Sequence, residues 1–445
     1  MGFKIYLLLY ILSVASVSLL SYKKGICLIW ISFLFIPTII LETNIKLRAE
    51  TILMLGSIIS ELRFRKRRVE WIKFFTDHRL FISVFFTVSV MIVFLSETVP
   101  IKHQLKCVID EIAFLLFAVQ TFMFVKGNQR IARSFIIIVC VAIIFNFVYC
   151  IIFEVIIGLN PAGMPLYILM GVDDNDFISD MIDYERGELS FRAQTIYRHP
   201  LSLGQYLLAL LPIFLSKRKF TLRFIFIAMI CILVILTGSR SSLFPLIIIL
   251  MWAFKNITSH VIPKMLFLLL TIIVCISFVP DRERKKVSEK VEPFVASLAF
   301  WDDKKQSDND IKGSSMEMRL NQFDAALKEI EGNPIFGRGY WYRDYYISKH
   351  NALHPDLLGF ESVLLLQLVE RGWLGLFTFF FLIFYLYRQL EKSSSEKPVI
   401  RYIFFGFIIS ILMTGVRPLS LLFVCLSSTI VCGMSSTKII RGQCK

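Results

Sequence analysis

Apolar runs long enough to cross a lipid bilayer recur along this chain, and they limit its fold more than any other feature. The hydrocarbon core of a bilayer is about 30 Å thick, and about 20 apolar residues of helix are needed to cross it. Of the 445 residues, 56% are hydrophobic, and the mean hydropathy is +0.67. A soluble domain of this size has too little interior to bury so much apolar surface. The sequence therefore predicts an all-α, polytopic transmembrane bundle, because the runs exclude a β-barrel or a single span.

We expect about 12–13 spans in this bundle. The possible thirteenth span is residues 49–62, a short segment that either crosses the membrane or lies in its interface. The side of the membrane on which the N-terminus lies therefore stays open. The other expected spans are 5–20, 26–41, 80–98, 107–125, 134–157, 199–215, 224–238, 243–255, 263–279, 363–388, 403–417 and 418–436.

The charges divide the connecting segments into two groups. Residues 158–198 carry seven acidic residues and residues 280–360 carry fourteen, so together they hold 21 of the 34 acids but only 16 of the 49 bases. Short links such as RFRKRR (63–68), and the C-terminal tail, are basic. By the positive-inside rule the basic links and the C-terminus are cytoplasmic, and the two long acidic loops face outward. Since the bases flank spans and suit anionic lipid, we expect membrane lipid and no nucleic acid as a partner.

This pattern predicts five regions along the chain. They are N-terminal transmembrane helices (1–157), an external loop (158–198), transmembrane helices with a turn at Arg240 (199–279), a large external loop with an amphipathic helix (280–360), and C-terminal transmembrane helices with a cytoplasmic tail (361–445). The nine cysteines lie mostly inside apolar runs, and none forms a metal-spaced pair, so we expect no metal and no cofactor.

The large loop contains the pattern of an amphipathic helix at residues 315–334. An apolar stripe at helical spacing predicts a helix that lies on the bundle, and its members are Met316, Leu320, Phe323, Leu327 and Ile330. Arg319 lies near the start of this helix, off the stripe. The next segment, FGRGYWYRDYY (336–346), holds Arg338, Tyr340 and Trp341, a mixture that suits sugar stacking or phosphate contact. An interfacial aromatic belt is an equally good interpretation.

Two arginines lie beside spans on the expected outer side. Arg240 stands in the small turn of LTGSRSSLF, between two apolar runs near the lower length limit for a span. Arg192 precedes the span that starts near residue 199. An arginine at such a depth needs an anionic partner or must reach the surface. Guanidinium groups match phosphate geometry and stay charged at any working pH, so the pair indicates a pyrophosphate or phosphosugar ligand.

Candidates for proton transfer lie in SKHNALHPDLLGFES (348–362). His350 and His354 are four residues apart, but Pro355 disfavours helix at His354 and no third ligand has suitable spacing, so zinc is disfavoured. Glu361 opens the apolar helix at the outer surface, and its ionised carboxylate can accept a proton from a sugar hydroxyl. A first-turn glutamate that matches the helix dipole is the alternative reading. We assign His354 to loop structure and keep Glu361 and His350 as candidate bases.

Four segments in order resemble the O-antigen ligase and polymerase superfamily: RAQTIYRHPLSLGQYL, LTGSRSSLFPLIIIL, MRLNQFDAALKEIEGNPIFGRGYW and ESVLLLQLVERGWLGLFTFF. The resemblance covers roughly residues 190–390. It implies an all-helical bundle that joins sugars outside the membrane, uses oligosaccharides on undecaprenyl pyrophosphate, and needs no metal. It also implies that Arg192 and Arg240 engage the donor pyrophosphate and that Arg319 opens the loop helix.

One position departs from the ligase branch, in which a His-Asn pair begins the helix before a Gly-x-x-Gly corner. Here the corner is Gly372-Trp373-Leu374-Gly375, and Glu361-Ser362 stands eleven residues before it. His350-Asn351 lies a further eleven residues back. Either the loop has an insertion or Glu-Ser replaces the pair, and the second reading resembles the polymerase branch.

The sequence therefore favours a repeat-unit polymerase of surface polysaccharide in the bacterial cytoplasmic membrane, with its active site on the outer face. A flippase and a chain-length regulator are candidate partners. The alternatives are a ligase that transfers a finished glycan to another acceptor, and a flippase or transporter of lipid-linked oligosaccharide. A transporter should place charges near mid-membrane, where Glu154 is the clearest candidate, whereas most polar groups here lie at the outer face.

Overall fold

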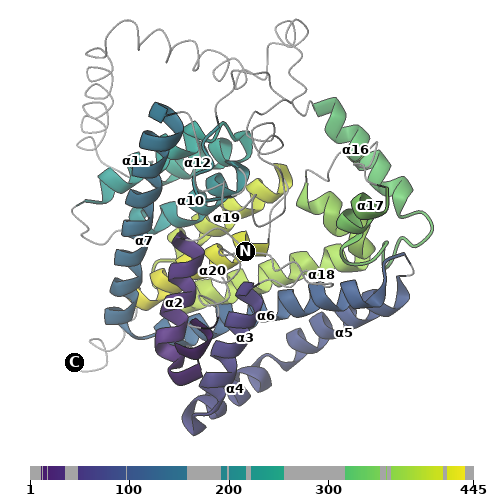
Figure 1. Cartoon of the computed structure of the whole chain (residues 1–445), viewed down its shortest axis with the longest axis horizontal. Helices are drawn as coiled ribbons and strands as arrows, with labels where there is room; N and C mark the ends of the chain where they lie inside the picture. The colour runs from purple at the N-terminus through teal and green to yellow at the C-terminus, as the bar shows by residue number, and fades with distance from the viewer. Residues whose placement is uncertain are drawn as a thin grey trace, which may run out of the picture.

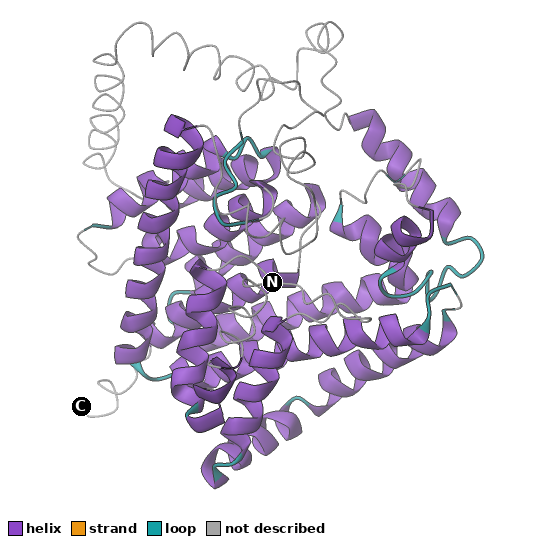
Figure 2. Cartoon of the chain, viewed as in Figure 1, coloured by secondary structure: helices purple, strands orange, loops and turns teal. Residues whose placement is uncertain are grey.

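The computed structural model describes a helical protein in the parts of the chain that it covers. It describes residues 12, 14–17, 19–35, 49–96, 98–157, 192–197, 200–216, 222–254, 316–350, 357, 362–413 and 418–435, and only the backbone at residues 49, 240, 254, 316–320, 413, 418–420 and 435. In these residues every regular element is a helix, as Figure 2 shows, which confirms the expected all-α class.

The helices follow the apolar runs of the sequence (Figure 1). Their bounds are α2 Tyr22–Phe35, α3 Ala49–Leu62, α4 Arg65–Asp77, α5 Arg79–Leu95, α6 Ile101–Val125, α7 Gln129–Tyr149, the π-helix η1 Cys150–Ile157, α10 Pro200–Leu215, α11 Arg223–Leu236, α12 Arg240–Phe254, α16 Met316–Glu329, α17 Tyr342–His350, α18 Val363–Ser393, α19 Lys397–Met413 and α20 Pro418–Ser435.

Three of the described helices are long and apolar enough to cross a membrane on their own: Ile101–Val125, Gln129–Ile157 and Val363–Ser393. The pair α4 and α5 would make a fourth span, although it is bent by 77°. Several other expected spans appear as shorter apolar helices, such as α10 and α11. The protein is therefore a multi-pass helical membrane protein. The full number of spans stays a prediction, because expected spans such as 263–279 lie outside the described residues.

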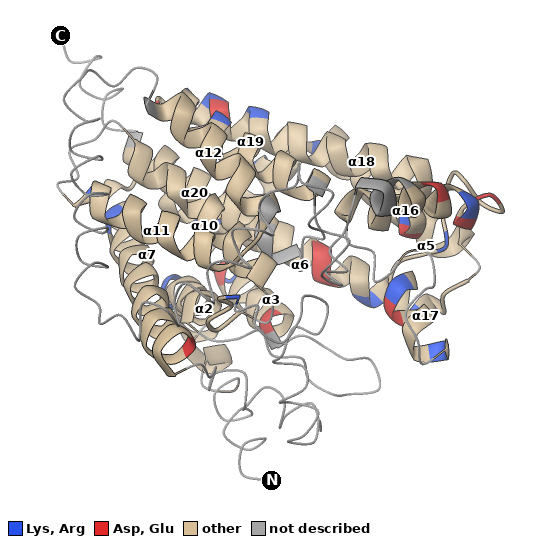
Figure 3. Cartoon of the chain, turned by 90° about the horizontal axis from the view of Figure 1, so that it is seen from above, with Lys and Arg blue, Asp and Glu red and all other residues tan. Residues whose placement is uncertain are grey.

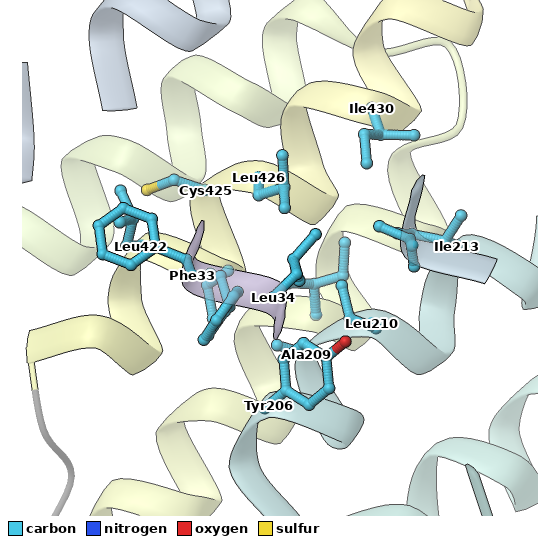
Figure 4. Close-up of a cluster of buried hydrophobic side chains, with 14 of the residues drawn as sticks. Phe33, Leu34, Tyr206, Ala209, Leu210, Ile213, Leu422, Cys425, Leu426 and Ile430 are labelled. Atoms are coloured by element: carbon cyan, nitrogen blue, oxygen red, sulfur yellow. The ribbon is translucent and has the colours of Figure 1, made fainter. Parts of the chain in front are cut away.

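Helix α10 lies at the centre of the bundle and packs against α11, α12, α19 and α20. Its residues are almost all buried, including Leu207, Leu210 and Leu211. Figure 4 shows Tyr206, Ala209 and Leu210 of α10 in one cluster with side chains of α2 and α20. Helix α10 is hydrophobic on all faces, as expected for a helix surrounded by protein and not by solvent.

Helices α16 and α17 form a separate layer that packs on α18, and they carry much of the charge visible in Figure 3. The group of α7, α10, α11 and α20, on the other side of the same view, shows few charged residues. A helix is thus present within the range expected at 315–334, as Met316–Glu329, and it packs on α18.

Two details differ from the sequence expectations. Phe323 of the expected apolar stripe is 42% exposed, whereas Gln322, Ala326 and Ile330 are buried. The stripe prediction was wrong at Phe323, because the small Ala326 lets α16 approach its neighbours on that side. Helix α6 also begins at Ile101 and not near residue 107. Pro100 precedes it, and the side chain of Gln104 in its first turn donates to the Val99 carbonyl oxygen at 2.8 Å.

Candidate functional site

The segment that carries Arg192 is bonded directly to the turn that precedes Arg240. The Ala193 N–H donates to the Leu236 carbonyl oxygen at 2.9 Å, and Arg192 Nε donates to the Thr237 carbonyl oxygen at 3.0 Å. Arg240 follows three residues later as the first residue of α12. Segments 45 residues apart in the sequence therefore meet, so the two arginines expected to act together start from adjacent backbone.

The turn between α11 and α12 is small and buried. Gly238 has φ of 60°, a left-handed conformation that suits glycine. Thr237, Ser239, Ser241 and Ser242 are all buried, and the Ser239 and Ser241 hydroxyl oxygens lie 2.8 Å apart. A turn at residues 237–239 thus separates the two apolar runs, and Arg240, expected in the turn, is the first residue of α12. The turn also leaves the backbone N–H groups at the start of α12 next to Arg240, and helix N-termini of this kind favour anions.

A buried carboxylate holds the Arg192 segment in place from the other side. Glu154 of η1 accepts hydrogen bonds at Oε1 from the backbone N–H groups of Gln194 at 3.2 Å and Thr195 at 2.8 Å. Thr195 Oγ1 donates to Asn146 Oδ1 at 2.6 Å. Thr195 has φ of 49°, a strained conformation for a β-branched residue, so these bonds stabilise a backbone shape that the chain would otherwise avoid.

Sequence reasoning missed Asn146 and Thr195, and it considered Glu154 only as a sign of transport. Glu154 is the clearest intramembrane acid by sequence, and such residues mark functional sites. The sequence therefore indicated Glu154, but it did not indicate the partners of Glu154, which lie 40 residues away on the Arg192 segment.

A second region lies where α18 is interrupted at Gly372, which has φ of 62° and ψ of −168°. The loop of residues 333–341, here called the docking loop, supplies the backbone partners that the interrupted helix lacks. The N–H groups of Arg338 and Gly339 donate to the carbonyl oxygens of Val369 and Glu370, each at 2.8 Å. In return, the Trp373 N–H donates to the Pro334 carbonyl oxygen at 2.9 Å. The break is therefore satisfied by protein, as backbone at membrane depth requires.

The contact between the docking loop and the break in α18 is called the joint below, and it needs glycine for two reasons. Gly337 and Gly372 both have positive φ, of 69° and 62°. A Cβ atom on Gly372 would lie 2.3 Å from the Ile335 carbonyl oxygen, and one on Gly337 would lie 2.5 Å from the Gly372 nitrogen. The docking loop and the break in α18 are therefore in direct backbone-to-backbone contact. The corner expected at Gly372 is present.

Buried side chains strengthen the joint. Arg371 forms an ion pair with Glu111 of α6, and its guanidinium lies 4.3 Å from the ring centroid of Tyr340. The Tyr340 N–H donates to Gln104 Oε1 at 3.1 Å. Sequence reasoning missed Arg371, Glu111 and Gln104 as partners, and the signal that could have found them is the pair of opposite charges in two apolar helices.

The docking-loop residues expected to bind glycan have different surroundings from one another. Tyr340 is 1% exposed with its ring under Arg371, and burial raises its pKa to about 12. It therefore presents no free face to a sugar in this structure. Arg338 Nε donates to the Glu329 carbonyl oxygen at 2.6 Å and holds the end of α16. Trp341 is partly exposed, has φ of 71°, and stacks on His103 at 4.4 Å between centroids.

The candidate bases are only partly covered by the structure. His350 is the exposed last residue of α17, where its ring stacks on Tyr346 at 4.1 Å. Figure 1 shows α17 on the opposite side of the molecule from α10, α11 and α12, so the structure does not bring His350 to the Arg192 segment. Glu361 and His354 lie outside the described residues. Arg319 is in α16, but its side chain lies outside the described part.

A family model described as O-antigen ligase matches residues 224–380, from α11 to the middle of α18. The match includes the turn before Arg240, helices α16 and α17, and the joint at Gly372, whereas Arg192 lies outside it. None of the curated proteins matches the chain. The match agrees with the resemblance that the motifs indicated, and residues 224–380 of this multi-pass helical membrane protein are similar to the O-antigen ligase family.

Proposed function

We propose that the protein polymerises oligosaccharide repeat units that are linked to undecaprenyl pyrophosphate, on the outer face of the bacterial cytoplasmic membrane. The observation that carries the proposal is the bond from Arg192 to the Thr237 carbonyl oxygen, because it joins the Arg192 segment to the start of α12. Two guanidinium-bearing residues and a helix N-terminus next to a membrane suit a lipid pyrophosphate.

The reaction is a single displacement. A hydroxyl oxygen of a second lipid-linked repeat forms a bond to the anomeric carbon of the donor, while the bond from that carbon to the pyrophosphate oxygen breaks. The electron pair stays on undecaprenyl pyrophosphate, where Arg192 and Arg240 stabilise the developing charge. Glu361 or His350 takes the hydroxyl proton. The anomeric centre is inverted, and no ATP is needed because the lipid pyrophosphate is already a good leaving group.

Glycan contacts outside the pyrophosphate are proposed for Arg319, Arg338 and Trp341. Of these, Trp341 has the best-suited surroundings among the described side chains, because it is partly exposed and its ring is already ordered by His103. Ordered aromatic rings of this kind favour sugar stacking.

Replacement of the two arginines tests the proposal. A guanidinium fork is not reproduced by an ammonium group, so Arg240→Lys, Arg240→Ala and Arg192→Lys should each lower polymer formation by about 100-fold. The polysaccharide made in a strain that lacks the native gene is run on a gel, with protein amount in the membrane measured in parallel. Arg130→Ala is the matched control, because Arg130 is an exposed basic residue at the N-terminal end of α7, the end away from Glu154. Full ladders from Arg240→Lys would contradict the proposal.

The same gel distinguishes the two candidate bases and the ligase alternative. We expect Glu361→Gln to give single repeat units only, and His350→Ala and His354→Ala to give ladders. Two observations support the ligase alternative: the description of the matched family, and the His350-Asn351 pair in the sequence, of which His350 ends α17. A full ladder from Glu361→Gln with none from His350→Ala would support the His-Asn pair and overturn the assignment of Glu361.

A further inference from the structure

Helix α4 (Arg65–Asp77) differs from the apolar helices of the bundle. It is bent by 77° from α5, which is largely apolar after its first residue, Arg79. Figure 1 shows α4 at the edge of the molecule, at the opposite end from α16. If α5 runs across the bilayer, a helix at this angle lies close to the plane of the membrane surface. It has no part in the arginine site or in the joint at Gly372.

A cluster of Glu61, Arg67 and Trp71, here called the hub, fixes the orientation of α4. Glu61, at the end of α3, is fully buried and accepts hydrogen bonds from Arg67 Nε at 2.7 Å and from Trp71 Nε1 at 3.0 Å. Arg67 also pairs with Glu70 and lies 5.5 Å from the ring centroid of Tyr22. These contacts use one side of the helix and determine which residues face outward.

The outward side of α4 carries three exposed apolar side chains among its bases. Val69 is 58% exposed, Ile72 is 64% exposed and Phe75 is 41% exposed. Spacings of three residues place these side chains on one face of the helix. In a protein that spans a membrane, such a face lies in the boundary between headgroups and acyl chains, about 5–10 Å deep.

The same helix is strongly basic. Its sequence RKRRVEWIKFFTD has five basic and two acidic residues, and Arg65, Lys66, Arg68 and Lys73 are exposed. One of the two acids, Glu70, is paired with Arg67. An apolar face with exposed bases is complementary to a membrane surface that carries anionic phospholipid.

We propose that α4 is an interfacial helix that binds anionic phospholipid headgroups. Val69, Ile72 and Phe75 enter the acyl boundary, while Arg65, Lys66 and Arg68 contact lipid phosphates. The hub at Glu61 holds this surface in a fixed orientation, so the lipid meets a preformed site. The proposal does not depend on the reaction that the protein catalyses.

Lipid titration of the purified full-length protein tests the proposal. Phosphatidylglycerol or phosphatidylcholine is added in detergent, and bound lipids are counted by native mass spectrometry. The unmodified protein should bind phosphatidylglycerol about tenfold more tightly, an advantage that Arg65→Gln with Arg68→Gln should remove. The control, Lys392→Gln with Lys397→Gln, removes two exposed bases at the ends of α18 and α19 and should keep the preference. No preference in the unmodified protein, or equal loss in both variants, would overturn the proposal.

Two further measurements sharpen the test, and the first of them needs no variant. Raising the salt concentration from about 0.05 M to about 0.5 M should abolish the lipid preference of the unmodified protein, because exposed charges are then screened. Ile72→Ser keeps every base but weakens the apolar face, so it should reduce binding of both lipids by about threefold. Unchanged binding by Ile72→Ser, or a preference that survives high salt, would count against an interfacial helix.

Discussion

The Arg192 segment and the docking loop both connect helices and are both fixed to apolar helices, but they are fixed by different kinds of contact. Side chains hold the Arg192 segment: Glu154 binds two of its backbone N–H groups, and Arg192 itself bonds to Thr237. The docking loop is held mainly backbone to backbone, across the interruption at Gly372. The first region should therefore be sensitive to the chemistry of a few side chains, and the second to the presence of any side chain at its glycines.

The largest expected effect is at the backbone joint. Gly372→Ala would place Cβ 2.3 Å from the Ile335 carbonyl oxygen at a positive φ, and strain with overpacking should cost about 3 kcal/mol of stability. We expect little monodisperse protein and a clear fall in the thermal unfolding midpoint in detergent. Gly332→Ala is the matched control, since a Cβ there meets nothing within 4 Å. Equal stability of the two variants would mean that the joint is not closed as described.

A smaller effect is expected at the side-chain anchor. Glu154→Ala leaves two backbone N–H groups without their acceptor and should lower the free energy of unfolding by about 2 kcal/mol. Glu154→Gln keeps an amide oxygen and should lose about half as much. Thermal unfolding measures stability, and the polysaccharide gel measures polymer formation, which should fall if Arg192 is displaced. If Glu154→Gln were as damaging as Glu154→Ala, the carboxylate charge and not the hydrogen-bond geometry would be the important property.

The smallest effect is expected at Phe323 of α16, a helix in the same layer as the docking loop. Phe323→Ser should change the free energy of unfolding by no more than about 0.5 kcal/mol, because Phe323 is exposed. Ala326→Leu, one turn away on the buried side, should cost about 1–3 kcal/mol through overpacking. If denaturation showed a larger loss of stability for Phe323→Ser than for Ala326→Leu, Phe323 would belong to the buried apolar stripe, as the sequence indicated.

The sequence was a good guide wherever a single segment decides its own structure. Apolar length predicted the helices α10, α18 and α20, and the family's Gly-x-x-Gly pattern indicated the corner at Gly372. Periodicity predicted α16 but not its buried face, because a small alanine packs more closely than an exposed phenylalanine and periodicity does not weigh size. For the candidate site, the sequence indicated the arginines, yet it could not show that Glu154 and Asn146 hold Arg192. Those contacts join residues about 40–50 positions apart, and no local rule encodes them.

The interruption of α18 also bears on how the protein is made. The docking loop precedes α18 in the chain, so ribosomes synthesise the partner of the break before the helix itself. Until the loop docks, the carbonyl groups of Val369 and Glu370 and the N–H groups of Trp373 and Leu374 have no protein partners across the break. Such groups are costly in hydrocarbon. Stable insertion of this helix is therefore coupled to a loop that must already be in place, which makes residues 333–341 a checkpoint in the biogenesis of the C-terminal half.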